Sequence, residues 1–320
     1  MYTKALGKNE KLKSNYNYME LQLKSCCIVW LVNRVESICK STGEPRLIMT
    51  KESVRNVTEH IKLPVLIFHE DLTPDIMEDF IEIYKDITFH KLDSFRDNAL
   101  PYNKSNCKCS KGYMTMCRFF SGILQQHEAL QCYEHYIRMD DDSFLIEPFI
   151  DIDTFLYPWN SGNSDYVFRT LFKDNAEKIN KPNGLFNFTN QFCLQYKLPI
   201  HKLIPHLIKI QFLYNDMYTG LAPYNNFHYS SLKLWKHPVI KHYIKIIIDN
   251  NFIHKHGWMD ANIHAMIIFI LAPLIGMKVQ NITNFGYRHN RTFSLLDSCG
   301  SEYRGEESFY PCREENTRCF

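Results

Sequence analysis

The sequence predicts an α/β protein in which a mixed central sheet is flanked by helices. Two short apolar runs, residues 26–32 and 64–68, are each followed by a segment in which apolar residues recur at helical spacing. Strands that alternate with helices in this way are typical of parallel βαβ units. A further strand is expected at residues 136–139, and three successive aspartates follow it directly. The chain therefore predicts one sheet with an acidic segment at the end of one strand.

The composition is that of a globular protein. Of the 320 residues, 45% are hydrophobic and 22% are charged, which is close to the average for soluble domains. The formal net charge is only +2, so the chain lacks the basic character of proteins that bind nucleic acid. Residues 1–25 are polar, and the longest apolar run, residues 265–277, is interrupted by Pro273. We therefore predict no signal peptide or membrane span, and a cytoplasmic or otherwise soluble protein.

Each predicted helix has a start signal and an apolar face. Thr50 can cap the first, and Thr73 followed by Pro74 begins the second. A third starts near Tyr113, and a fourth opens at Pro238. Their expected buried residues are Val54, Val57 and Ile61 in the first, Met77, Phe80, Ile81 and Tyr84 in the second, Met116, Phe120, Ile123, Leu124 and His127 in the third, and Ile240, Tyr243, Ile244 and Ile247 in the fourth. Asp260 can cap a fifth helix that runs to residue 271.

Asp140, Asp141 and Asp142 are the strongest candidates for a functional site. They lie between two apolar segments, and adjacent carboxylates repel one another unless a cation neutralises them. Carboxylate oxygens suit Mg²⁺ or Mn²⁺. In an extended chain the side chains of Asp140 and Asp142 point to the same face, so both could bind one ion that bridges a diphosphate. The alternative is an exposed acidic turn without a ligand.

Three blocks of sequence resemble the fungal α-1,2-mannosyltransferase family, the glycolipid 2-alpha-mannosyltransferases of glycosyltransferase family 15. They are YMTMCRFFSG at 113–122, GWMDANIH at 257–264 and FGYRH at 285–289, with the acidic segment between the first two. The resemblance covers residues 26–291 and implies a GT-A-like nucleotide-diphospho-sugar transferase fold. It implies one catalytic domain at 26–296, with a nucleotide-binding half at 26–150 and an acceptor half at 151–296, between a polar N-terminal segment and a tail at 297–320.

The resemblance also implies a reaction and a set of site residues. The reaction is transfer of a hexosyl unit, mannose from GDP-mannose, to a sugar hydroxyl of a glycan or glycoconjugate, with retention of configuration. The family's metal position, Mn²⁺ or Mg²⁺, corresponds here to Asp140, Asp142 and His289, and Asp260 corresponds to an aspartate that faces the acceptor. Trp258 is then expected to contact the acceptor, and the expected donor contacts are Asn33, Arg34, Tyr113, Arg118, Arg138 and Asp141. Asn33 and Arg34 are also indicated by their place after the first strand, because ligands of open α/β sheets lie there.

Two features depart from the family pattern. Members of the family are typically Golgi proteins with an N-terminal membrane span, so the Golgi lumen is the alternative location. In the family a glutamate with the position of a nucleophile or cation stabiliser follows an Asn-Phe pair, whereas here His228 follows Asn226 and Phe227. We give His228 a place in the catalytic site but expect no sugar to be attached to it. A neutral imidazole suits hydrogen bonding or general-base work, so we expect front-face transfer assisted by the leaving diphosphate.

Two other functions use the same kinds of residues. A metal-dependent phosphotransferase or nuclease also has clustered aspartates, although it usually needs further acidic ligands for a second ion. A catalytically impaired protein that binds a nucleotide sugar without turnover would keep the same donor contacts. The eleven cysteines are interpreted mainly as reduced thiols, because no secretory signal is apparent.

Overall fold

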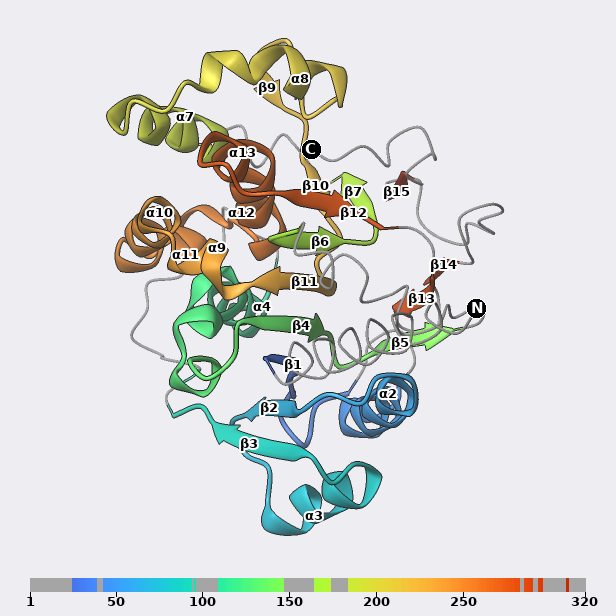
Figure 1. Cartoon of the computed structure of the whole chain (residues 1–320). Helices are drawn as coiled ribbons and strands as arrows, with labels where there is room; N and C mark the ends of the chain where they lie inside the picture. Colours follow the sequence, from blue (N-terminus) through green and yellow to red (C-terminus); the bar gives the residue numbers. More distant parts are fainter. Residues whose placement is uncertain are drawn as a thin grey trace, which may run out of the picture.

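The protein is built around a seven-stranded mixed sheet (Figure 1). The computed structural model describes residues 25–38, 43–93, 95, 109–146, 164–173, 184–282, 285–289, 293–295 and 309–310. The strands of the sheet are β1 (Cys26–Leu31), β2 (Val65–His69), β3 (Ile87–Lys91), β4 (His135–Met139), β6 (Tyr166–Phe168), β11 (Phe227–Ser231) and β12 (Val279–Asn281). Their order is β12-β6-β11-β4-β1-β2-β3. β1 to β4 run parallel, and β11 is antiparallel to both of its neighbours, so the predicted mixed sheet is confirmed.

The two faces of the sheet carry separate hydrophobic clusters. Along β1, Cys27 and Val29 belong to one cluster, whereas Cys26, Ile28 and Trp30 belong to the other. This alternation follows from the two-residue period of a strand. All five side chains are buried, which explains why the strand reads as an uninterrupted apolar run.

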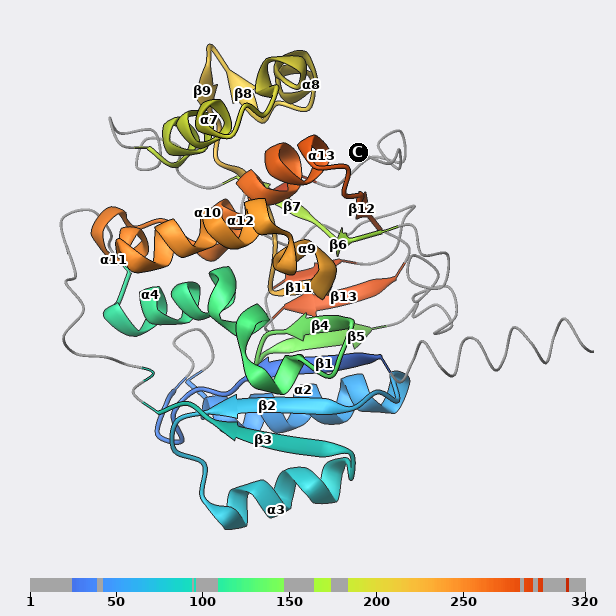
Figure 2. The same cartoon turned by 60° about the vertical axis from the view of Figure 1, so that its left-hand side comes forward.

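Helices cover both clusters. The first cluster packs against α4 (Lys111–Arg118), α10 (Pro238–Asp249) and α12 (Asp260–Met266), and the second against α2 (Arg46–His60) and α3 (Pro74–Ile83). Figure 2 shows α3 beside β3, at the edge of the sheet. The buried residues of α10 are those that its spacing predicts. The helices therefore leave the carboxyl end of β4, with its aspartates, at an edge between the two layers.

Several boundaries differ from the prediction. α2 begins at Arg46 and contains Thr50, whose hydroxyl donates to the Arg46 carbonyl at 2.9 Å and caps nothing. On the predicted buried face of α3 only Phe80 is buried, and Ile81 is 42% exposed. The sequence pattern does not predict β3, because the ITFHK segment has only two apolar residues.

Smaller sheets lie beside the central one. Their strands are β5 (Ser143–Ile146), β13 (Gly286–His289) and β14 (Phe293–Leu295) in one sheet, β7 (Leu171–Lys173), β10 (Leu221–Pro223) and β15 (Phe309–Tyr310) in another, and β8 (Leu213–Tyr214) with β9 (Met217–Tyr218) in a third. The other helices are α7 (Leu185–Gln195), α8 (Ile204–Lys209), α9 (Leu232–Lys236), α11 (Phe252–His256) and α13 (Ala272–Leu274). The predicted tail thus contributes one strand, β15, to a small sheet.

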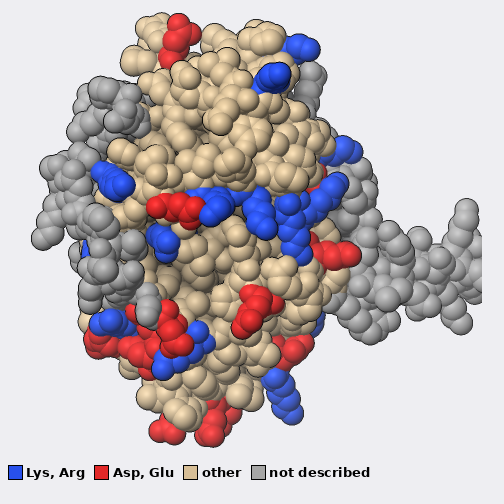
Figure 3. Space-filling model, turned by 90° about the vertical axis from the view of Figure 1, so that its left-hand side faces the viewer, with Lys and Arg blue, Asp and Glu red and all other residues tan. Residues whose placement is uncertain are grey.

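Charge is unevenly spread over the surface. Figure 3 shows Lys and Arg side chains gathered in a band across one face. The exposed lysines of α9, α10 and α11 are Lys233, Lys236, Lys241, Lys245 and Lys255. In the described parts of the chain, every helix is too short or too polar to cross a lipid bilayer.

Candidate active site

The three aspartates form a tight turn between β4 and β5. The Asp140 amide donates to the Asn226 carbonyl at 3.0 Å, and the Ser143 amide donates to the Asp140 carbonyl at 3.2 Å. The expectation that Asp140 and Asp142 share a face of an extended strand is therefore wrong. Asp140 and Asp142 nevertheless lie near one another, because the turn brings both side chains toward His289.

His289 is brought to this turn by pairing of β13 with β5. The register places His289 opposite Ser143, and its Nε2 atom lies 2.9 Å from Oδ1 of Asp142 and 3.9 Å from Oδ2 of Asp140. Gly286 allows this pairing, since a Cβ atom there would collide with the carbonyl oxygen of Ile146. The structure thus brings together the three residues that the resemblance assigns to the metal.

The three groups perturb one another's proton affinity. Burial raises the pKa of Asp142, but its contact with His289 and the nearby Arg46 outweigh burial and leave the pKa below its ordinary value. Burial lowers the pKa of His289, but Asp142 and Asp140 outweigh it, and the pKa is raised. Burial raises the pKa of Asp140 despite the opposing effects of Arg138 and His289. The contact between His289 and Asp142 therefore favours the charged form of each of these two groups.

The donor set fits a hard divalent cation. Oδ1 of Asp142 is buried and makes no hydrogen bond of good geometry within the protein. Nδ1 of His289 lies 2.6 Å from the hydroxyl of Tyr224, a contact that fixes the ring and can leave Nε2 as the ligand atom. Within the described ranges, no group of three or more His, Cys, Asp or Glu side chains is already arranged around a common metal position. A cation would therefore have to replace the direct contact of His289 with Asp142.

Asp141 points into a separate ion pair. It accepts from Nδ2 of Asn33 at 2.7 Å and from Nη1 of Arg46 at 2.5 Å. The two expected donor contacts Asn33 and Asp141 therefore bond to each other, and their contact with the donor stays a prediction. Arg46, at the start of α2, also lies 4.0 Å from Asp142. Sequence reasoning missed Arg46 because nothing local in the sequence connects it with the aspartates.

α2 holds the strand that follows the turn. The side-chain amide of Asn56 donates to the Leu145 carbonyl at 2.9 Å and accepts from the Leu145 amide at 2.7 Å. The Ser53 hydroxyl donates to the Ser143 carbonyl at 2.6 Å. With Arg46 at its first turn, α2 therefore fixes the backbone from Asp141 to Leu145.

Arg138 lies below the turn and pairs with two carboxylates. Its Nε and Nη2 atoms donate to Oδ1 of Asp140 at 3.1 and 2.9 Å, and its Nη1 atom donates to Oδ2 of Asp260 at 2.6 Å. The guanidinium carbon lies 3.5 Å from the centre of the Phe120 ring. Because Arg138 is 1% exposed and its donors are committed, the structure contradicts the expected contact with the donor. It acts instead as an internal counter-ion.

Asp260 is held by its neighbours rather than capping a helix. It is the first residue of α12, and the N-cap position before it is Met259. Nδ2 of Asn225 donates to the same oxygen as Arg138 does, at 3.0 Å. Burial raises the pKa of Asp260, but Arg138 outweighs burial and the pKa is lowered. Tyr113, 41% exposed, lies near Asp260 and Asp140 at the rim of the site.

His228 is a core residue, and its assignment to the catalytic site is wrong. It is 0% exposed. Nδ1 lies 3.1 Å from the Asn225 carbonyl and Nε2 lies 3.1 Å from the Tyr136 hydroxyl, so both ring nitrogens are engaged. Burial and the nearby His264 lower the pKa of His228 well below its ordinary value. The sequence of β11, FHYSS, does not reveal this, because it mixes polar with aromatic residues although all five are buried.

Three other expected contacts lie away from the acidic turn. Trp258 is 3% exposed and packs against Phe188 and Phe252, which contradicts an acceptor contact. Arg34 pairs with Glu70 at 3.3 Å. Arg118 is near His254 of α11, whose pKa is lowered to about 4 by burial and by Arg118. Arg34 follows Asn33, the partner of Asp141, and the donor contacts expected of Arg34 and Arg118 stay predictions.

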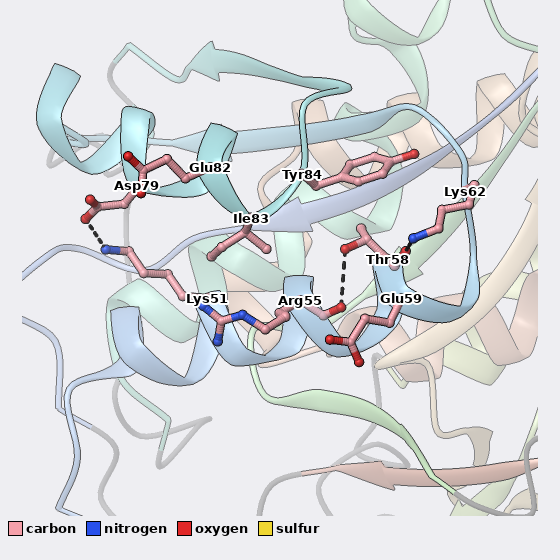
Figure 4. Close-up of a pocket in the computed structure, with 9 residues that line it drawn as sticks. All are labelled: Lys51, Arg55, Thr58, Glu59, Lys62, Asp79, Glu82, Ile83 and Tyr84. Atoms are coloured by element: carbon pink, nitrogen blue, oxygen red, sulfur yellow. Dashed lines mark hydrogen bonds and ion pairs between the residues drawn. The ribbon is translucent and has the colours of Figure 1, made fainter.

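A pocket in the described residues lies elsewhere, between α2 and α3 (Figure 4). Its lining residues are Lys51, Arg55, Thr58, Glu59, Lys62, Asp79, Glu82, Ile83 and Tyr84. Lys51 points across it to Asp79. Since charges of both signs alternate and none of the aspartates of the turn lines it, we assign this pocket no part in the site.

Comparison with known proteins agrees with the geometry. Residues 70–302 match the family described as glycolipid 2-alpha-mannosyltransferase. The chain is 26% identical over 182 residues to glycolipid 2-alpha-mannosyltransferase 1 of Candida albicans, covering 56% of this chain and 40% of that protein. It is also 26% identical over 183 residues to the O-glycoside alpha-1,2-mannosyltransferase omh1 of Schizosaccharomyces pombe, covering 56% and 44%. The chain thus spans less than half the length of these curated relatives.

Solved structures share the fold. The Mn/GDP form of core-mannan synthase A (CmsA/Ktr4) from Aspergillus fumigatus matches with a TM-score of 0.67 at 16% identity, covering 89% of this chain and 80% of that one. The mannosyltransferase Ktr4p from S. cerevisiae matches with a TM-score of 0.66 at 16% identity, covering 97% and 88%. The predicted GT-A-like fold is confirmed. Because the family pattern extends over most of the sequence, the chain belongs to the glycolipid 2-alpha-mannosyltransferase family.

Proposed function

We propose that this protein is a metal-dependent mannosyltransferase that moves mannose from GDP-mannose to a sugar hydroxyl with retention of configuration. The observation that carries the proposal is the meeting of Asp140, Asp142 and His289 from distant parts of the chain, with Arg138 linking the first of them to Asp260. The names of the relatives support the reaction class, and the Mn/GDP form of one of them supports the donor and the ion.

Asp140, Asp142 and His289 would hold Mn²⁺, or Mg²⁺ in its place. The bound ion would neutralise the negative charge that develops on the departing diphosphate. The protein's own part is to aim the ligand atoms: Arg138 takes Oδ1 of Asp140, which leaves Oδ2 to face His289. Arg46 neutralises Asp141, so the carboxylate of Asp141 does not compete with Asp140 and Asp142 for the ion.

Asp260 would orient the acceptor hydroxyl. A carboxylate kept ionised by Arg138 accepts a hydrogen bond well but is a weak base. With His228 buried in the core, this site offers no imidazole nucleophile beside the donor. We therefore propose front-face transfer, in which an oxygen of the leaving diphosphate takes the proton of the hydroxyl that Asp260 positions.

The rival functions make different demands. A two-metal phosphotransferase or nuclease needs acidic ligands for a second ion, yet Asp141 is engaged by Asn33 and Arg46 and Asp260 by Arg138 and Asn225. A binding protein without turnover would keep all these contacts. It differs from an enzyme only in the fate of the sugar.

Titration calorimetry with GDP and GDP-mannose, with and without Mn²⁺, followed by a transfer assay with simple mannosides, tests the proposal. We expect Mn²⁺-dependent binding of both nucleotides and an α-linked product by NMR. Asp142→Asn should lose Mn²⁺-dependent binding, whereas Asp216→Asn, an exposed aspartate in the β8–β9 turn, should bind as the wild type does. Binding without transfer would favour the impaired protein, and an inverted product would refute front-face transfer.

A further inference from the structure

Two buried polar side chains beside the acidic turn have no hydrogen-bond partner within the protein. Asn226 is 4% exposed, and neither its Nδ2 nor its Oδ1 atom has a partner. Thr170 is 2% exposed, and its hydroxyl has none. An unsatisfied buried donor or acceptor typically costs about 1–3 kcal/mol, so native proteins retain few of them unless they serve a ligand or a bound water.

These side chains lie close to Asp140 and His289. β11 pairs antiparallel with β4, with Phe227 opposite Met139. One step further along this register, the Asp140 amide donates to the Asn226 carbonyl at 3.0 Å, so Asn226 lies opposite Asp140. Thr170 lies opposite Tyr224, because the Tyr224 amide donates to the Thr170 carbonyl at 2.8 Å and this bond continues the pairing of β10 with β7. The Tyr224 hydroxyl in turn contacts His289 at 2.6 Å, so Asn226 and Thr170 both lie beside the proposed metal ligands.

The unpartnered amide of Asn226 differs from other buried amides. Asn262 and Asn281 each have an unpartnered oxygen, but both donate from Nδ2, to the Tyr218 hydroxyl at 3.2 Å and to the Arg169 carbonyl at 3.0 Å. Among the described residues, Asn226 is the buried amide that lacks partners on both atoms. Its neighbour Asn225 is fully used, since it donates to Asp260 at 3.0 Å.

The geometry points to a subsite for the hydroxyl groups of the transferred hexose, formed by Asn226 and Thr170. The amide offers donors and an acceptor, and the Thr170 hydroxyl offers one of each, which matches a pair of neighbouring sugar hydroxyls. The two side chains add no charge, so the ligand they suit is neutral. The subsite lies next to Asp140, whose side chain is 24% exposed, and Asn226 follows Asn225, which donates to Asp260. This inference rests on the proposed function. It names the residues that would contact the sugar rather than the nucleotide.

Comparison of GDP and GDP-mannose separates sugar contacts from nucleotide contacts. In Mn²⁺-containing buffer, Asn226→Leu should leave the Kd of GDP unchanged and raise the Kd of GDP-mannose about tenfold, the effect of losing one or two hydrogen bonds. Thr170→Val should do the same to a smaller degree. Leucine nearly matches asparagine in size and needs no hydrogen bond, so Asn226→Leu should melt at or above the wild-type temperature.

Asn262→Leu is the matched control, because it also replaces a buried asparagine with an unpartnered oxygen, on α12. It should not change the ratio of the two Kd values. Unchanged GDP-mannose binding in both Asn226→Leu and Thr170→Val would overturn the subsite, as expected if these groups hold only water. A rise in the KM of the acceptor alone would overturn it in favour of an acceptor contact. Wild-type protein that binds neither nucleotide would contradict the proposed function itself, and the subsite with it.

Discussion

Asp140 and Asp260 share a single guanidinium: Arg138 donates to both, and Arg138 and Asp260 are buried, whereas the side chain of Asp140 is 24% exposed. One carboxylate belongs to the proposed metal site and the other to the proposed acceptor site. Because Arg138 is stacked on Phe120 and 1% exposed, it has little freedom to move. The distance between the two sites is therefore fixed by one side chain.

Replacing Arg138 with Met should destabilise the fold strongly. The change leaves Asp140 and Asp260 buried without their cation, and breaking such a pairing typically costs about 3–5 kcal/mol. The free energy of unfolding, from urea titrations with a chelator present, measures the effect. Arg55→Met, on the exposed side of α2, should change it by less than about 0.5 kcal/mol. If Arg138→Met combined with Asp260→Asn proves as unstable as the sum of the single changes, Arg138 does not act through Asp260.

Tyr224→Phe should weaken metal binding without removing a ligand. The Tyr224 hydroxyl contacts Nδ1 of His289 at 2.6 Å, and loss of such an orienting contact typically lowers metal affinity about 10- to 100-fold. The Kd of Mn²⁺ is measured by titrating the protein with Mn²⁺ and recording the free ion by electron paramagnetic resonance. Tyr229→Phe is the matched control, because Tyr229 makes the same kind of contact with Nδ1 of His135, also at 2.6 Å, at the other end of β4. Equal effects of the two changes would show that orientation of His289 is not the cause.

Asn56→Ala should cost about 1–3 kcal/mol of the free energy of unfolding. It leaves both backbone groups of Leu145 in β5 without their partner, and unsatisfied groups carry that penalty. Asn187→Ala, at an exposed position on α7, is the control and should be nearly neutral. The two asparagines both begin Asn-x-Ser/Thr sequences, so peptide mapping of protein from a secretory host should find glycan at Asn187 and none at Asn56. Glycan on Asn56 in folded protein would contradict its pairing with β5.

The protein should lose stability in mild acid through buried histidines. Burial lowers the pKa of His264 to about 4, against an ordinary value of about 6.5 in an unfolded chain. Between these values the unfolded chain binds the proton and the folded protein does not, so stability is complete above pH 6.5 and falls as the pH drops to 4. For His264 alone the loss reaches about 3 kcal/mol.

Unfolding by urea at several pH values across this window measures the loss. His264→Gln should give a shallower dependence on pH than the wild type, whereas His201→Gln, at an exposed position, should leave the dependence unchanged. If His264→Gln changes the free energy of unfolding equally at every pH, so that its dependence on pH stays that of the wild type, the acid sensitivity is due to other groups, such as His228.

Local sequence patterns predicted the parts of the fold that depend on local rules. β1, β2 and β4 are apolar runs buried on both faces, and α10 has a regular apolar stripe, so burial and period determine them. The start of α2 was placed five residues late, with Thr50 as the N-cap in place of Pro45, because Thr50 bonds within the helix instead of capping it. β3 escaped notice because an edge strand buries few residues.

Site residues could be predicted only where their side chains can serve few purposes in a buried position. Consecutive aspartates between buried segments need cations, whatever the fold, and that argument located the turn. The cations that balance them were harder to predict. Arg46 reaches Asp141 from α2 through tertiary packing, and Arg138, two residues before Asp140, was assigned to the donor instead of to the carboxylates. Trp258 and His228 were misassigned because an aromatic or imidazole ring in a motif is compatible with either a ligand or the core.

The order in which the chain is made gives the shared Arg138 a second consequence. β1 to β4 with α2 precede the partners Asp260 and His289 in the sequence. During synthesis, Arg46 and Arg138 are therefore the first groups able to balance the three aspartates, and the early half can pack around them while the rest is still being added. β11 follows and can pair with β4 before Asp260 is made. The later ion pair of Asp260 with Arg138 then ties α12 to the early half of the chain, so the side chain that links the two proposed sites also links the two halves of the fold.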